Sequence, residues 1–139
     1  AACALSLPVL ASRRLDRRPW IWLTLLMQMA SFAGLAFAPL SAPVVFAVLA
    51  GAGLGGCFAL SMVVALDHLD HPVHAGALSA MMQGGGFLIA AIPPWIVAAL
   101  HDATGSFAPG WLMHLACTLL VAILTARFVP RGYARAMRM

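Results

Sequence analysis

The stretch 76–100 contains no ionisable side chain, and it constrains the fold more than any other part of the chain. About 20 consecutive apolar residues form a helix long enough to cross the roughly 30 Å hydrocarbon core of a bilayer. The stretch nevertheless holds three consecutive glycines at 84–86 and the pair Pro93-Pro94. In a membrane such residues are tolerated where other helices or a water-lined cavity satisfy the freed backbone groups, and transporters build substrate sites from such helices. The stretch therefore predicts a lining helix of a transporter, with Pro93 and Pro94 in a packing or hinge role.

The composition agrees with a membrane protein. Hydrophobic residues make up 63% of the chain and charged residues 9%, against about 25% charged residues in an average soluble domain. All eight positive charges are arginines, which gather at 13–18 and 127–138 beside apolar runs. This pattern is typical of cytoplasmic flanks of membrane spans, and it does not indicate a nucleic-acid partner. The three cysteines lie inside apolar runs, which favours small core residues over a redox role; they are Cys3, Cys57 and Cys117.

The apolar runs predict an all-α polytopic membrane protein with four complete spans and one partial span. The partial span covers 1–11, and the complete ones cover 20–38, 44–66, 76–100 and 110–129. In the partial span the apolar run precedes the arginines, which is the reverse of a secretory signal. We interpret it as the tail of a span, so that the chain is the C-terminal part of a longer transporter and its partners include the missing N-terminal helices.

Two of the spans carry helix-packing signals. Gln28 is the one strongly polar side chain of 20–38, and we expect it to form an interhelical hydrogen bond. In 44–66, Gly51 and Gly55 lie four residues apart, and Gly56 lies four residues after an alanine. Small residues at this spacing favour close helix packing over direct substrate contact. At 1.5 Å per residue, Gly55 and Gly85 both lie roughly 15 Å from the nearer end of their spans, so we expect the two glycine clusters to meet near the midplane.

The connection 67–74 contains two aspartates and three histidines, which are metal-ligating residue types. Pro72 prevents a continuous helical face there, and the chain has no second ligand cluster. We therefore expect a solvated loop and predict no metal site. No motif indicates a covalent enzyme or a cofactor.

One face of the third span is small and weakly polar. A 3.6-residue period aligns six residues on it: Ser79, Gln83, Gly86, Ala90, Pro93 and Val97. Such a face fits either a cavity or a helix–helix seam, and the residues themselves leave both readings open.

Orientation follows from the arginines. Four spans separate the loop 12–18 from the tail, so both lie on the same side, and the positive-inside rule places them in the cytoplasm. We expect a multi-pass protein of a bacterial inner membrane, with Arg17 and Arg18 helping to fix its orientation.

Two motifs carry a family likeness: the run 76–91, which contains Gln83 and the three glycines, and the element Leu-His-Asp-Ala-Thr-Gly-Ser at 100–106. The chain resembles the C-terminal part of a major facilitator superfamily transporter, from the end of helix 8 through helix 12. Within that superfamily it is similar to the branch of cyanate permeases and a 2-nitroimidazole exporter. The loop signature of the superfamily is degraded: Arg13 matches its arginine and Arg17-Arg18 its final pair, but Ser12 stands in place of the aspartate.

The resemblance implies secondary active transport of a small solute, a small anion such as cyanate, by alternating access. It implies that helices 10 and 11 line the central cavity, which gives these candidate cavity residues: Ser61, Ser79, Gln83, Gly84, Gly85 and Gly86. No Arg or Lys lies at mid-depth, so we expect the residue that reads the substrate charge outside this sequence. The alternatives are efflux of hydrophobic drugs and, more distantly, a haem-binding membrane anchor that uses His101 and His114. The expected partners are the lipid bilayer and a small-molecule substrate.

Overall fold

The computed structural model describes residues 18–67 and 72–127, and all regular secondary structure in this part is helical. Four stretches are long and apolar enough to cross a membrane: Arg18–Phe37, Pro43–Leu66, Val73–Thr104 and Ala108–Thr125. The prediction of an all-α polytopic membrane protein is therefore confirmed. The predicted partial span at 1–11, Arg13, Arg17 and the basic tail lie outside the described residues. The helices are α2 (Arg18–Phe37), α3 (Pro43–Asp67), α4 (Pro72–Ala90), α5 (Ile92–Thr104) and α6 (Ala108–Thr125).

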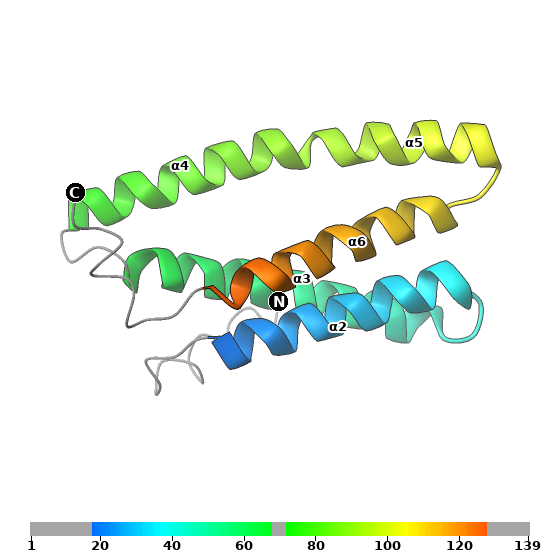
Figure 1. Ribbon diagram of the computed structural model, residues 1–139, viewed down its shortest axis with the longest axis horizontal. Helices are drawn as coiled ribbons and strands as arrows, with labels where there is room; N and C mark the ends of the chain where they lie inside the picture. Colours follow the sequence, from blue (N-terminus) through cyan, green and yellow to red (C-terminus); the bar gives the residue numbers. More distant parts are fainter. Residues whose placement is uncertain (1–17, 68–71, 128–139) are drawn as a thin grey trace.

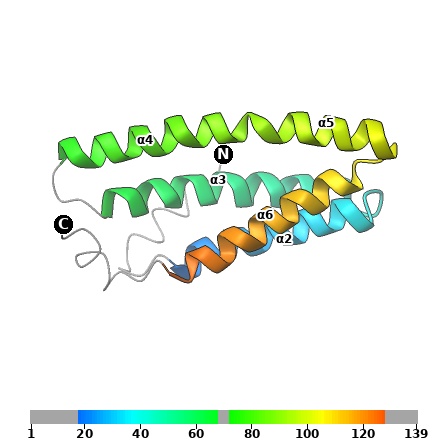
Figure 2. The ribbon, with the colours of Figure 1, turned by 45° about the horizontal axis from the view of Figure 1, so that its top comes forward.

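The helices form a packed group and a rod. α2 packs most extensively against α3 and α6, and α4 and α5 continue one another as a rod alongside this group (Figures 1 and 2). The α2–α3 turn and the α5–α6 turn lie at the same end of the molecule (Figure 1). Successive membrane crossings are therefore antiparallel, as the parity argument for the loops requires.

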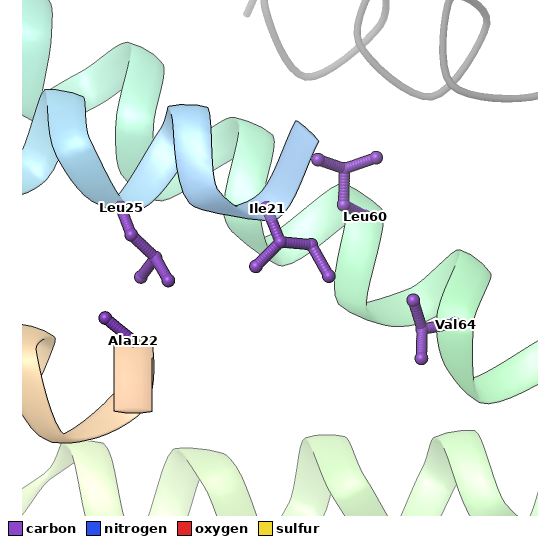
Figure 3. Close-up of a cluster of buried hydrophobic side chains, with 5 residues drawn as sticks. All are labelled: Ile21, Leu25, Leu60, Val64 and Ala122. Atoms are coloured by element: carbon purple, nitrogen blue, oxygen red, sulfur yellow. The ribbon is translucent and has the colours of Figure 1, made fainter. Parts of the chain in front are cut away.

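The apolar core lies where α2, α3 and α6 meet. Figure 3 shows its five buried side chains, which come from all three helices: Ile21, Leu25, Leu60, Val64 and Ala122. Because lipid tails are as apolar as these side chains, this cluster stabilises the group by close packing and not by exclusion of water.

A polar contact joins α2 and α3 where their backbones lie close together at Gly53. The side-chain amide of Gln28 donates a hydrogen bond of 3.1 Å to the carbonyl of Gly53, which confirms the expected interhelical role of Gln28. A Cβ on Gly53 would lie 2.7 Å from the Gln28 Cγ and 2.8 Å from the Thr24 carbonyl oxygen. Only glycine therefore allows the two backbones to approach this closely.

The predicted glycine pairs do not make this contact. Gly51 is exposed, and a Cβ on it would meet no atom within 4 Å, whereas Gly56 is buried and Gly55 half-buried. The packing roles of Gly51, Gly55 and Gly56 remain predictions. A Cβ on any glycine of 84–86 would also meet nothing within 4 Å, and the expectation that the glycine clusters of α3 and α4 meet near the midplane stays a prediction.

The family element at 100–106 forms the end of α5 and the first residues of the turn to α6. α5 ends because Gly105 adopts a left-handed conformation with φ 67°, and its N–H donates to the carbonyl of His101. The Thr104 hydroxyl donates to the carbonyl of Leu100 and accepts from the N–H of Ser106. The Ser106 hydroxyl in turn accepts from the N–H of Ala108 at the start of α6. The Thr-Gly-Ser sequence therefore fixes the hairpin by local hydrogen bonds.

Candidate functional site

The rod of α4 and α5 is interrupted at its proline pair and not at its glycines. α4 continues through residues 84–86, and the break lies at Ala91, whose N–H still donates to the carbonyl of Phe87. Pro93 and Pro94 have no N–H groups, so they cannot bond the carbonyls of Ile89 and Ala90 four residues earlier. Two backbone acceptors at this junction therefore lack their usual helical donors.

A groove between α3 and α4, the α3–α4 groove, has a volume of about 270 Å³. It brings together three of the predicted cavity residues, Ser61, Gln83 and Gly86. The other lining residues are apolar: Phe58, Met62, Met82, Phe87 and Ala90. Ser79, Gly84 and Gly85 do not line it; Ser79 is half-buried on α4, and the two glycines are exposed.

The polar groups of the α3–α4 groove are neutral. The Ser61 hydroxyl donates 2.8 Å to the carbonyl of Phe58 in its own helix, which leaves its oxygen able to accept. Gln83 is exposed, and its side-chain amide makes no hydrogen bond to any described residue. An unpaired amide can both donate and accept. The groove can therefore orient a small polar solute without a fixed charge.

A second groove, the α5–α6 groove, has a volume of about 640 Å³. Its residues come from the rod and from α6: Ala90, Pro93, Pro94, Val97, Ala98, Phe107, Gly110, Trp111 and His114. Ala90 lines both grooves. The small face predicted on the third span thus follows both grooves from Gln83 to Val97, with Ser79 as the exception.

The histidines have separate aromatic neighbours. His101 stacks on Phe107 with ring centroids 4.0 Å apart, whereas the His114 ring lies 5.5 Å from that of Phe32 and 6.2 Å from that of Trp111. This arrangement does not support a pair of axial haem ligands. In the part of the chain that the structure describes, no cluster of three or more His, Cys, Asp or Glu residues could hold a metal ion. Of the loop predicted at 67–74, residues 68–71 lie outside that part, and the others belong to the ends of α3 and α4.

Fixed charges lie only at helix ends in the described residues. Arg18 begins α2, Asp67 ends α3, Asp102 lies in the last turn of α5, and Arg127 follows α6. The expectation of no Arg or Lys at mid-depth therefore agrees with the helix bounds.

Comparison with known proteins places the chain among transporters. It is 42% identical to the cyanate transport protein CynX of Escherichia coli strain K12 over 130 residues, 94% of this chain and 34% of that protein. It is 30% identical to the 2-nitroimidazole transporter of the same organism over 128 residues, 92% of this chain and 31% of that protein. The chain is a homologue of these transporters, and its resemblance to the C-terminal part of a major facilitator superfamily transporter is confirmed.

A third relative is named for a different kind of solute from the first two. The chain is 32% identical over 101 residues to a candidate anionic 4-hydroxy-benzoate permease of Thauera aromatica, covering 73% of this chain and 61% of the relative. The chain spans about a third of the length of the first two relatives. No family model and no solved structure matches it. It is an integral, multi-pass membrane protein related to small-solute transporters.

Sequence reasoning missed two features of these sites. The close approach of Gly53 has no spacing signature, because it depends on which residue of α2 lies opposite. The aromatic side of the α5–α6 groove does have a spacing signature. Its residues follow an i, i+4, i+7 pattern, which places them on one face of a helix: Phe107, Trp111 and His114.

Proposed function

We propose that the chain forms part of a secondary transporter that moves a small anion such as cyanate by alternating access, with the α3–α4 groove in its path. The amide of Gln83, which bonds no described residue and faces a groove shared with Ser61, carries this proposal. Gln83 lies 11 residues into α4, roughly 16 Å from the helix start by the 1.5 Å rise, and about 8 Å before the midpoint of the 32-residue crossing Val73–Thr104, which places it inside a 30 Å core. Transporters bind their substrates at this depth.

A neutral groove suits a substrate that must also be released. An anion in a poorly solvated site needs hydrogen-bond donors to replace its water. The two N–H groups of the Gln83 amide supply donors, and about 270 Å³ leaves room for water to remain around a small anion. A positive charge, if the transport cycle uses one, comes from helices outside this chain. Placing that charge on other helices agrees with the comparison, in which this chain matches only about a third of the length of the first two relatives.

The apolar lining of both grooves favours one second candidate, the efflux of hydrophobic compounds. Such a substrate would depend on Phe58, Met62 and Phe87 and not on the Gln83 amide. The two functions therefore differ in how they respond to a charge at position 83.

The test is uptake of labelled cyanate by the full-length transporter in proteoliposomes. Gln83→Ala should lower kcat/KM on the order of tenfold, the cost of one hydrogen bond to an ion. Gln83→Glu should lower it further, because a carboxylate repels an anion. Met81→Ala is the matched control, since Met81 is exposed on the same helix turn and lines neither groove.

Full cyanate uptake by Gln83→Ala at every concentration would contradict the anion path. Unchanged cyanate uptake by every variant, together with export of an apolar dye by every variant, would favour the second candidate. Folded yield from size-exclusion traces normalises each rate.

A further inference from the structure

The α5–α6 groove carries a constellation that the small-anion proposal does not use. One wall is formed by Trp111 and His114 of α6 together with Phe107 directly before that helix, and the opposite wall by Pro93, Pro94 and Val97 of α5. A volume of about 640 Å³ lies within the range of small-molecule sites, which are mostly apolar with a few placed polar groups.

The aromatic side chains of this groove are held from behind. Phe32 of α2 is buried, and its ring stacks on that of Trp111 with centroids 6.1 Å apart and planes 20° apart. The same ring contacts His114. His101 stacks on Phe107 at 4.0 Å. The aromatic wall is therefore positioned before any ligand arrives, which reduces the ordering cost of binding.

One polar atom of this wall has a defined role. The Nδ1 atom of His114 lies 2.8 Å from the carbonyl oxygen of Gly110. A carbonyl can only accept, so Nδ1 carries the proton and, in the neutral ring, Nε2 is an acceptor. No described residue donates a hydrogen bond to Nε2. The groove therefore combines flat apolar surfaces with one hydrogen-bond acceptor.

We infer that the α5–α6 groove binds planar, uncharged aromatic or heteroaromatic compounds that carry one N–H or O–H donor. The ring of the ligand stacks on Trp111 and Phe107, and its donor bonds Nε2 of His114. Aromatic pairs prefer such stacked arrangements with centroids 4.5–7 Å apart. This site is separate from the α3–α4 groove, so its occupancy does not require that the anion proposal hold.

The position of this groove links it to the transport path. Ala90, at the end of α4, lines both grooves, and the acceptors freed by Pro93 and Pro94 lie at the same junction. From this junction the α5–α6 groove extends to Phe107 at the turn between the helices. An aromatic ligand there contacts the proline junction of the rod directly.

The test compares indole with 1-methylindole, which has the same ring but no N–H. Binding to the full-length protein in nanodiscs is measured by equilibrium dialysis, with empty nanodiscs subtracted. Wild-type protein should bind indole about fivefold more tightly, since one neutral hydrogen bond contributes about a factor of five. In His114→Phe, which keeps a ring but removes the acceptor, the ratio should fall to about one.

A second variant tests the groove without touching His114. Ala98→Trp places a bulky ring in the groove from α5 and should abolish binding of both compounds, whereas Met81→Ala should leave both affinities unchanged. Equal affinities for the two compounds in wild-type protein would overturn the role of Nε2. Undiminished binding by folded Ala98→Trp would overturn the site itself and indicate ordinary partition into lipid. Neither outcome affects cyanate uptake through Gln83, so the two proposals fail separately.

Discussion

Two glutamines with the same chemistry lie in opposite surroundings in this chain. Gln28 is buried, and its amide donates to the carbonyl of Gly53 across the α2–α3 interface. Gln83 faces the α3–α4 groove and bonds no described residue. In a membrane an amide that is not paired with protein must find water or a substrate. The residue environment therefore separates a structural glutamine from a substrate-binding candidate.

Gly53→Ala should destabilise the protein at this interface. The added Cβ would meet the Thr24 carbonyl oxygen at 2.8 Å, and a backbone atom in a helix cannot move aside cheaply. We expect a loss of about 1–3 kcal/mol, typical of overpacking, seen as a lower melting temperature of the purified protein.

Gly51→Ala is the matched control for Gly53→Ala. It adds the same methyl group to the same helix where nothing lies within 4 Å, so its melting temperature should stay within experimental error or rise slightly. Equal losses for the two variants would mean that helix propensity, and not the contact with Thr24 and Gln28, determines the effect.

The sequence predicted the role of Gln28 but not that of Gly53. A long polar side chain in an apolar span needs a partner, so Gln28 could be assigned from its own chemistry. Within α3 the four-residue spacing rule selected Gly51, Gly55 and Gly56, whereas the glycine whose Cβ position meets the α2 backbone is Gly53, opposite Gln28. Which glycine meets the neighbouring helix depends on the rotation of two helices, and a single sequence does not contain that rotation.

At the scale of elements, the rod of α4 and α5 separates the effects of glycine and proline. Each glycine of 84–86 keeps its N–H and can continue the hydrogen-bond ladder, at a cost of about 1 kcal/mol relative to alanine. Proline removes the donor outright. Because the bilayer core offers no water to replace these bonds, the helix persists through the glycines and breaks before Pro93. The sequence assigned a packing or hinge role to Pro93 and Pro94, and the break lies directly before them; movement at this junction stays a prediction.

Replacing both prolines should make the rod more rigid. Pro93→Ala with Pro94→Ala restores N–H donors to the carbonyls of Ile89 and Ala90 and joins α4 to α5. We expect a higher melting temperature, slower amide hydrogen exchange around residues 89–94, and a lower maximal uptake rate, because lost flexibility at a hinge slows conformational change.

If the double proline variant shows slower amide hydrogen exchange but an unchanged uptake rate, this junction is not a hinge in the transport cycle. The Gly85→Ala variant serves as a comparison, since it stabilises the same rod away from the break, where a Cβ meets nothing within 4 Å.

At the scale of the molecule, α2, α3 and α6 share a core, whereas the rod of α4 and α5 is largely exposed. No side chain of α5 is buried among the described residues. Apolar side chains exposed on the rod carry no penalty in lipid. The four crossings alternate in direction (Figure 1), as the arginine pattern requires. The side of the membrane on which each end lies remains a prediction.

Single cysteines test that orientation. We expect Ser41 and Ser106, both exposed in the turns at one end, to face outward, and the tail beyond residue 130 to face the cytoplasm. In a background that lacks the native cysteines, an impermeant thiol reagent added to intact cells should label Ser41→Cys and Ser106→Cys. Labelling of Arg135→Cys without Ser41→Cys would reverse the topology.

The central claim is that the α3–α4 groove belongs to a water-accessible transport path. The most direct measurement is the reaction of Gln83→Cys, in the full-length transporter without its native cysteines, with a charged, water-soluble methanethiosulfonate reagent. Only a hydrated thiolate reacts, so Gln83→Cys should be modified rapidly, whereas Met81→Cys on the same helix, which lines neither groove, should not. Equal protection of both cysteines, or faster reaction at position 81, would contradict the account.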